Sequence, residues 1–206
     1  MTKLSSIQVD VSVFMLTSAV DTCSIWNLLS SPRLLSAALG KGCSFVVAGY
    51  VHFEAVEKPR SNPSLADIDM RQQFRDRLEK RRGFARMPIT VEDLAAVASI
   101  QEARKLGRGE IAALALALKL RAAIMTDDQG ARRAAPKVGV VGAQTTPHLL
   151  GWLLYEGALG DGDVGDVIAE HEERVTETQG RLSKYFRHIH GEAYRCRLLR
   201  DHLRTG

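Results

Sequence analysis

Few cysteines and the lack of a long apolar run are the first features of this 206-residue chain. Its three cysteines, Cys23, Cys43 and Cys196, are widely spaced and include no metal-type CxxC pair. An odd number of widely spaced cysteines favours a protein of a reducing compartment over a secreted disulfide scaffold. No stretch approaches ~18 uninterrupted apolar residues, and Met1 to Asp10 lacks the hydrophobic core of a signal peptide. We therefore expect a cytoplasmic protein that makes no membrane contact.

The composition predicts one main domain with an appendage. With 45% hydrophobic residues, the chain can form the core of a domain of about 150 residues. We place this domain at residues 11–159, with a basic helical insertion at 58–88, and a helical extension at 160–206. The net charge of +4 is small, so the local distribution of charge carries more information than the sum.

Acidic residues recur where a strand is predicted to end or a helix to begin. Asp21 follows the β-branched and apolar run 11–20 and precedes a segment with helical spacing. Glu54 comes shortly after the strand-like residues 44–48, on a segment that we expect to be helical. Glu110 follows a break with two glycines and opens the alanine-leucine helix 111–120. Asp127 and Asp128 end the predicted strand 122–126.

The predicted strands and helices favour an α/β fold with an open, mostly parallel sheet. Carboxyl ends of parallel strands lie along one edge, so these acids should converge although the chain separates them widely. Clustered carboxylates repel one another, and a bound cation relieves the repulsion. Because the set offers oxygen ligands with no matching cysteines or histidines, it favours Mg²⁺ or Mn²⁺ over Zn²⁺.

From about Met15 to Leu159 the chain resembles the PIN-domain family of metal-dependent nucleases, particularly the VapC-like ribonucleases that act as toxins of toxin–antitoxin pairs. The order and spacing of several segments carry the resemblance. They are Ala19-Val-Asp-Thr-Cys-Ser-Ile-Trp-Asn-Leu-Leu29, Val51-His-Phe-Glu-Ala-Val-Glu57, Leu106-Gly-Arg-Gly-Glu-Ile-Ala-Ala-Leu-Ala-Leu-Ala117 and Ile124-Met-Thr-Asp-Asp-Gln-Gly-Ala-Arg132, followed by a strand at 138–142 and a helix at 146–154.

The resemblance implies a PIN-like three-layer α/β/α fold and hydrolysis of RNA with one or two Mg²⁺ or Mn²⁺ ions. Asp21 and Asp128 would be the inner ligands, and Glu54 and Glu110 would complete the shell. Many family members carry Asp at the third position, so Glu110 is a departure. The fourth ligand stays open between Asp127 and Asp128, with Asp128 favoured slightly.

Three hydroxyl residues beside these acids, Thr22, Ser24 and Thr126, could hydrogen-bond to the carboxylates or to waters on the metal. An ordinary role as helix caps and turn residues is equally compatible with their positions.

A basic stretch separates the second acid from the third. Residues 58–87 contain nine Lys or Arg against four acids, and we predict a helix at 70–82. It could bind RNA phosphates, remain a solvated helix, or contact a second subunit or partner protein. The RNA-binding candidates are Arg71, Arg75, Arg81, Arg82 and Arg132.

The extension beyond Leu159 divides by charge. Residues 161–180 contain seven acids and one Arg, whereas residues 181–206 contain seven bases and two acids. The halves could pair with each other or with a neighbouring subunit. The aromatic residues among the bases could contact RNA, or pack on the main domain.

These observations predict a Mg²⁺- or Mn²⁺-dependent endoribonuclease, a hydrolase that is the toxin of a toxin–antitoxin pair. Its expected partners are RNA, a cognate antitoxin and a second copy of the chain. Two other classes stay open. One is a non-catalytic PIN-like module that binds RNA or protein, and the other is a Mg²⁺-dependent phosphotransferase on a similar sheet.

Overall fold

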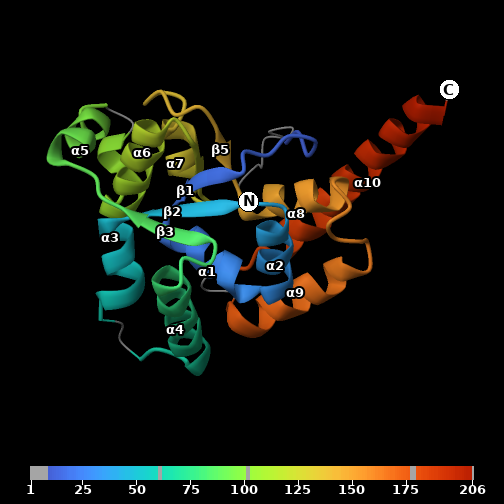
Figure 1. Cartoon of the computed structure of the whole chain (residues 1–206), viewed down its shortest axis with the longest axis horizontal. Coiled ribbons are helices and arrows are strands. Elements are labelled where there is room, and N and C mark those ends of the chain that lie inside the picture. Colours follow the sequence, from blue (N-terminus) through green and yellow to red (C-terminus); the bar gives the residue numbers. More distant parts are fainter. Residues whose placement is uncertain (1–8, 60–61, 101–102, 177–179, 206) are drawn as a thin grey trace.

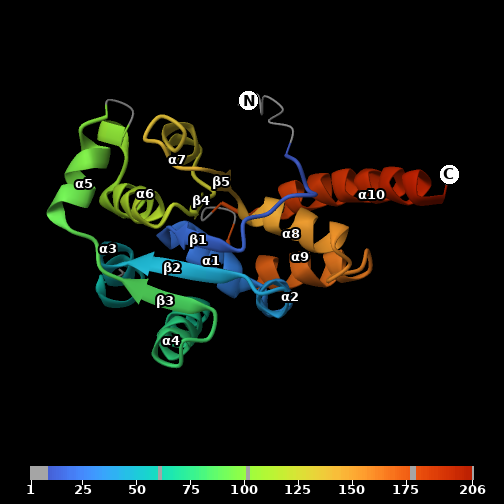
Figure 2. The same ribbon diagram turned by 45° about the horizontal axis from the view of Figure 1, so that its top comes forward.

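A computed structural model describes residues 9–59, 62–100, 103–176 and 180–205. Its centre is a five-stranded sheet with the order β3-β2-β1-β4-β5, in which every pair is parallel (Figures 1 and 2). The strands are β1 (Thr17–Val20), β2 (Ser44–Ala48), β3 (Phe84–Met87), β4 (Ala123–Met125) and β5 (Ala143–Gln144). The expected three-layer α/β/α class with a parallel central sheet is confirmed.

The three middle strands, β2, β1 and β4, consist almost wholly of buried residues. Parallel sheets are covered on both faces, which explains why these strands are apolar runs without polar alternation. The edge strand β3 differs, because its central Ala85 and Arg86 are exposed. Its pairing with β2 brings the end of the basic stretch into the sheet.

Two groups of helices cover the sheet. In the first, α6 packs against β1, β2 and β4 and contacts α3, α5 and α7. In the second, α1 contacts α2, α4, α8 and α9. The helices are α1 (Thr22–Ser30), α2 (Pro32–Gly40), α3 (Gly49–His52), the π-helical turn η1 (Phe53–Glu57), α4 (Leu65–Glu79), α5 (Val91–Ala98), the 3₁₀ turn η2 (Ala103–Lys105), α6 (Arg108–Leu120), α7 (Gln129–Ala134), α8 (Thr146–Tyr155), α9 (Asp163–Arg174) and α10 (Ser183–Thr205).

Two predicted elements differ from those in the structure. The strand expected at 138–142 is wrong, because residues 136–139 form a turn and the last strand is β5, at 143–144. Its position is set by pairing with β4, where Ile124 lies opposite Ala143. The basic helix expected at 70–82 is α4, which begins earlier, at Leu65. There Ser64 forms a capping box with Asp67.

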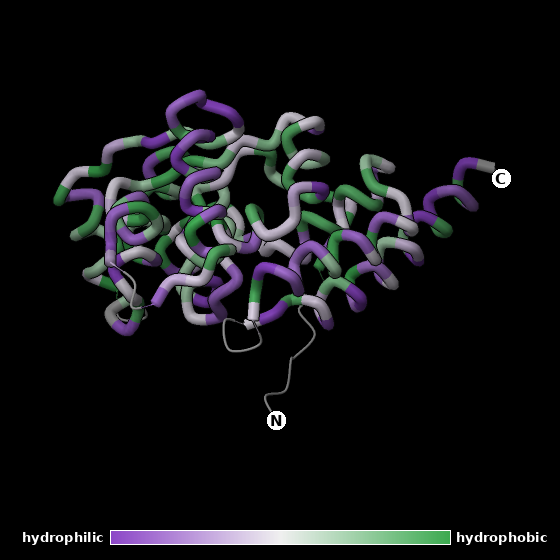
Figure 3. The backbone as a smooth tube through the Cα atoms, turned by 90° about the horizontal axis from the view of Figure 1, so that it is seen from below, coloured by the Kyte–Doolittle hydropathy of each residue, from purple (hydrophilic) through white to green (hydrophobic). Residues whose placement is uncertain are grey.

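The C-terminal extension packs on the main body. Helix α10 lies along α8 and contacts α9, and its C-terminal end projects beyond the rest of the molecule (Figures 1 and 2). Leu182, Phe186 and Ile189 of this segment belong to the same buried core as the sheet. The projecting end mixes hydrophilic and hydrophobic residues (Figure 3), and Leu198, Leu199 and Leu203 are exposed there.

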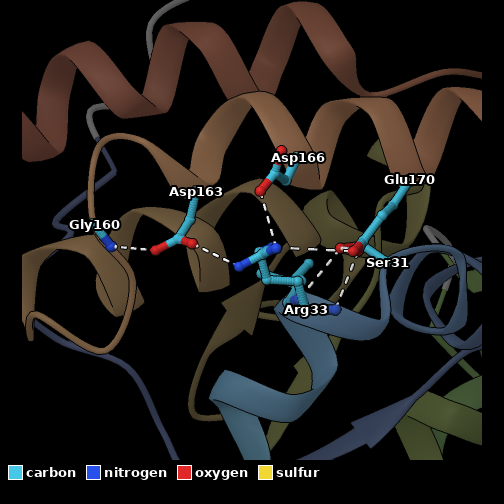
Figure 4. A network of polar contacts seen from close by, with 7 residues as sticks. Ser31, Arg33, Gly160, Asp163, Asp166 and Glu170 are labelled. Carbon is cyan, nitrogen blue, oxygen red and sulfur yellow. Dashed lines mark hydrogen bonds and ion pairs between the residues drawn. The ribbon is translucent and has the colours of Figure 1, made fainter.

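Charge pairing within the chain joins the extension to the body. Arg33 of α2 binds Asp163 at 2.7 Å and Asp166 at 2.9 Å, and its backbone nitrogen donates to Glu170 (Figure 4). Arg197 of α10 pairs with Asp161. The two oppositely charged halves of the extension therefore contact each other directly. Among the described helices, none is long and apolar enough to cross a membrane.

Candidate functional site

The predicted acids lie at the carboxyl end of the central strands. Asp21 directly follows β1, and Asp127 and Asp128 lie just beyond the neighbouring strand β4. Parallel register places Val20 opposite Met125, and the Asp21 backbone nitrogen donates to the Met125 carbonyl at 3.3 Å. The sheet thus brings together residues that the sequence separates by about a hundred positions.

Asp21 is the most buried of these acids, with 2% of its surface exposed. Its Oδ1 accepts a hydrogen bond from the Ser24 backbone nitrogen at 2.7 Å and caps α1, and its Oδ2 accepts from the Thr126 hydroxyl. Burial raises the pKa of Asp21 to about 6, against the lowering effect of these hydrogen bonds. The negative charge of Asp127 raises it further.

Asp127 and Asp128 differ in how many donors they bind. Asp127 accepts from Asn27 Nδ2 at 2.8 Å, from the Thr146 backbone nitrogen at 2.9 Å and from the Thr146 hydroxyl at 2.6 Å. Asp128 caps α7 through Oδ1, which accepts from the Ala131 nitrogen at 2.8 Å. Within the described residues no hydrogen bond reaches Asp128 Oδ2, so Asp128 keeps more capacity for a further ligand.

Glu54 reaches the same region from η1. Its Oε2 accepts from the Thr22 hydroxyl at 3.0 Å, and Oε1 lies 3.9 Å from Lys58 Nζ. Gly109, at the start of α6, permits this position, because a Cβ atom there would overlap Glu54 Oε2. The absence of a side chain at position 109 therefore has a steric reason, which the position of Gly109 in a helix does not reveal by itself.

Glu110 caps α6 by accepting from the Gly107 backbone nitrogen. Burial raises the pKa of Glu110, and the nearby charges of Asp128 and Glu54 raise it further. Glu110 therefore lies within electrostatic range of two of the other predicted acids.

Cys23 lies close enough to four of these acids to be influenced by their charges. The side chain is exposed, yet partial desolvation of the thiol together with the charges of Asp21, Asp127, Glu110 and Asp128 raises its pKa to about 12. A thiol with this pKa stays protonated at neutral pH and is a poor nucleophile. The charges of four carboxylates therefore act on one side chain. We call Asp21, Glu54, Glu110, Asp127 and Asp128 the acid edge.

The oxygens of the acid edge do not meet at one point. Within the part of the chain that the structure describes, no three His, Cys, Asp or Glu side chains form a group ready to hold a metal ion. The carboxylates instead bond to helix N-termini and to hydroxyl or amide donors. Of the predicted hydroxyl residues, Thr22 and Thr126 donate to acids, whereas Ser24 contributes its backbone nitrogen.

A groove of about 720 Å³ opens beside the acid edge. Cys23, Asn27, Asp127 and Asp128 line one wall, and residues 180–185, Arg187 and Glu172 line the other. Sequence reasoning missed Asn27 and Thr146, because an amide and a hydroxyl carry no signal until the partner Asp127 is known. It also gave no reason to place residues 180–187 opposite the acids.

The five predicted RNA-binding arginines lie elsewhere. Arg71 and Arg75 are on α4, Arg81 and Arg82 follow it, and Arg132 is on α7. None of them lines this groove. Arg71 contacts the Lys58 carbonyl at 3.4 Å and Arg75 contacts Gln72 at 3.2 Å, so both make local bonds within their own segment.

No protein-family model matches the chain, and comparison with curated proteins and with solved structures gives no significant match.

Proposed function

We propose that this chain is a metal-dependent endoribonuclease that hydrolyses RNA phosphodiester bonds at the acid edge. The observation that carries the proposal is the lack of cationic partners there. Within the described residues, no Lys, Arg or His forms an ion pair with Asp21, Glu110, Asp127 or Asp128. Glu54 has only a distant contact with Lys58. Four carboxylates that influence one thiol and have no cationic partner among the described residues favour a bound cation.

The donor chemistry of the acid edge fits Mg²⁺ or Mn²⁺. Every candidate ligand is a carboxylate oxygen, which such hard ions prefer. Asp21 is buried with a raised pKa, so a divalent cation would stabilise its ionised form. Asp21 and Asp128 would be the principal ligands, with Glu54 and Glu110 completing the set.

Asp127 fits a supporting role. Its carboxylate already accepts three hydrogen bonds, which tie α1 through Asn27 to the start of α8 through Thr146. Thr126 and Thr22 hold the carboxylates of Asp21 and Glu54 in orientation. When bound, one or two metal ions would activate a water for in-line attack on phosphorus and stabilise the leaving 3′ oxygen. The products would carry 5′-phosphate and 3′-hydroxyl ends.

The biological setting in this proposal is a toxin–antitoxin pair in the cytoplasm, with a cognate antitoxin and a second copy of the chain as protein partners. The support for it is the resemblance of the four acid-bearing segments to VapC-like toxins. A small gene for an antitoxin next to the coding sequence would support this setting independently of any enzyme assay.

A non-catalytic PIN-like module that binds RNA or protein is the second candidate. The observation that favours it is that Asp21, Glu110 and Asp128 cap helices, and that no three of the described acids form a group ready to hold a metal ion. Titration with Mn²⁺ separates the two, because a site retained only for structure should not bind the metal.

Cleavage of total RNA and tRNA by purified wild type, Asp21→Asn and Asp163→Asn tests the proposal. Asp163 serves as the matched control, because it is an acid outside the acid edge that pairs with Arg33. We expect Mg²⁺- or Mn²⁺-dependent cutting by wild type and Asp163→Asn, and none by Asp21→Asn or in EDTA. Equal cutting by wild type and Asp21→Asn would contradict the assignment, and so would cutting that persists in EDTA.

A further inference from the structure

The groove beside the acid edge has walls of opposite chemistry. On one side lie Asp127 and Asp128, and on the other lie Arg181, Lys184 and Arg187 with Tyr185 and a single acid, Glu172. The second wall belongs to the C-terminal extension, which the resemblance to PIN-domain nucleases does not cover. The role of this wall therefore has to be argued from its own contacts.

The basic wall is anchored to α1 through the buried residue His171. The Leu182 backbone nitrogen donates to His171 Nε2 at 3.0 Å. A backbone N–H can only donate, so Nε2 accepts and Nδ1 carries the proton. Nδ1 then donates to Ser30 Oγ at 2.7 Å, and Ser30 donates to the Asn27 carbonyl at 2.7 Å.

This chain of bonds fixes the start of α10 to α1. Its last member, Asn27, also donates to Asp127, so the same network reaches the acid edge. Phe186 packs edge-on against the His171 ring and is fully buried. Arg181 adds bonds to the carbonyls of Val175 at 2.7 Å and Glu172 at 3.0 Å. The wall is consequently a fixed part of the groove.

With Phe186 and Ile189 turned into the core, α10 presents Lys184 and Arg187 to solvent. Lys184 Nζ lies 4.8 Å from the centre of the Tyr185 ring, so an aromatic face and a cation adjoin at the groove. Among the described residues, Arg187 contacts one acid, Glu172, at 3.9 Å, and its side chain is 64% exposed. Such a loosely held guanidinium is available for a phosphate.

We propose that residues 180–187 form the RNA-binding wall of the groove, in which Lys184 and Arg187 bind phosphates of single-stranded RNA and Tyr185 stacks on a base. This inference rests on the proposed function, because the facing acids would act on the bound strand. Cations for phosphates and an aromatic face for an unstacked base are the elements by which proteins hold single strands. An acidic peptide suits the groove less well, since it would leave the ring of Tyr185 with no base to stack on.

Fluorescence anisotropy with a labelled single-stranded RNA of mixed sequence tests the wall, using the full chain in EDTA at several salt concentrations. Chelation prevents metal-dependent cleavage, so binding is measured apart from catalysis. The variants are Lys184→Ala with Arg187→Ala, Tyr185→Phe and Tyr185→Leu. The control is Arg195→Ala with Arg204→Ala, which removes two exposed charges of the same helix outside the groove.

We expect the Lys184/Arg187 double variant to bind at least about tenfold more weakly, and the slope of log affinity against log salt to fall by about 1.4, for two lost phosphate contacts. Tyr185→Leu should weaken binding about tenfold and Tyr185→Phe should not, because stacking needs the ring and not the hydroxyl. The distal control should bind within about twofold of wild type.

Equal binding by wild type and the Lys184/Arg187 variant would overturn the inference. Failure of wild type to bind RNA would overturn it too, and binding of a labelled poly-glutamate peptide in its place would assign the wall to an acidic protein partner. The nuclease proposal fails separately, if RNA binds through this wall and no metal-dependent cleavage follows. Conversely, unchanged kcat and KM for cleavage by the double variant would refute the wall and leave the nuclease intact.

Discussion

Two acid clusters in this molecule differ in what neutralises them. At the joint between α2 and α9, Asp163, Asp166 and Glu170 surround one guanidinium, that of Arg33 (Figure 4). At the acid edge, the described residues supply hydroxyl, amide and backbone donors but almost no cation. The first cluster has its counter-ion built in and joins two helices. The second has no such counter-ion among the described residues, and we propose that a metal ion supplies it.

The largest expected effect is that of Asp21→Asn, which should strongly reduce cleavage and stabilise the fold in EDTA. Loss of a ligand should reduce cleavage by about 100-fold or more, since loss of an outer partner alone typically costs 10–100-fold. Asn caps α1 as well as Asp does, and it carries no charge to bury. The difference between a pKa of about 6 and the ordinary 3.8 corresponds to roughly 3 kcal/mol.

The sign of the change in stability follows from the raised pKa of Asp21. The contribution of Asp21 to stability is full below pH 3.8 and is lost as the pH rises through about 6. Urea unfolding in EDTA should therefore show Asp21→Asn to be more stable than wild type at pH 8 and about equal to it at pH 4. Asp163→Asn should instead be less stable at pH 8, because it loses the ion pair with Arg33. A less stable Asp21→Asn at pH 8 would contradict the account.

His171 should show the opposite pH dependence. Burial lowers its pKa from 6.5 to about 4, so its contribution is full above pH 6.5 and is lost as the pH falls through 4, by roughly 3 kcal/mol. In wild type the effects of His171 and Asp21 on the pH dependence of stability offset each other between about pH 4 and 6. Asp21→Asn should leave a stability that rises with pH in this window. In His171→Gln the stability should instead fall as the pH rises. Identical pH profiles of stability for the two variants would contradict these opposite contributions.

A smaller effect is expected at the neutralised cluster. Arg33→Gln removes the common partner of three acids, whose side chains are partly exposed. Because exposed ion pairs contribute little individually, we expect a loss of about 1–2 kcal/mol. Urea unfolding at low and high NaCl should show a smaller deficit at high salt, where repulsion among the acids is screened. RNA cleavage should be unchanged, and a loss of cleavage would link the two clusters.

The smallest effect on stability is expected for Gly109→Ala. Alanine favours the helix by up to about 1 kcal/mol, and the overlapping Glu54 carboxylate can swing away, so the net change in unfolding free energy should be near zero. Cleavage should nevertheless fall several-fold as Glu54 leaves the acid edge. Gly165→Ala, at an open position on α9, is the control. Unchanged cleavage by Gly109→Ala would remove Glu54 from the site.

The sequence predicts the elements whose signals are local. Residues 44–48 form β2 as expected, and the alanine-leucine run forms most of α6. Strand β5 could not be predicted, since it has two residues and exists through pairing with β4. The edge strand β3 was not predicted either, because half of its residues are exposed.

The site was predictable in position but not in detail. Strand ends locate the acids at one edge, whereas the same Asp and Glu residues serve equally as helix caps and as ligands. Only the structure shows that Asp127 binds Asn27 and Thr146, while no hydrogen bond from a described residue reaches Asp128 Oδ2. The basic wall depends on which face of α10 turns inward, and the buried contact of Phe186 with His171 sets that face.

The most direct test of the central claim is calorimetric titration of wild type, Asp21→Asn and Asp166→Asn with Mn²⁺ at pH 7.5. The account predicts one or two bound ions for wild type and for Asp166→Asn, and no binding by Asp21→Asn. Equal Mn²⁺ binding by wild type and Asp21→Asn, or no binding by wild type, would contradict the claim that the acid edge is a metal site.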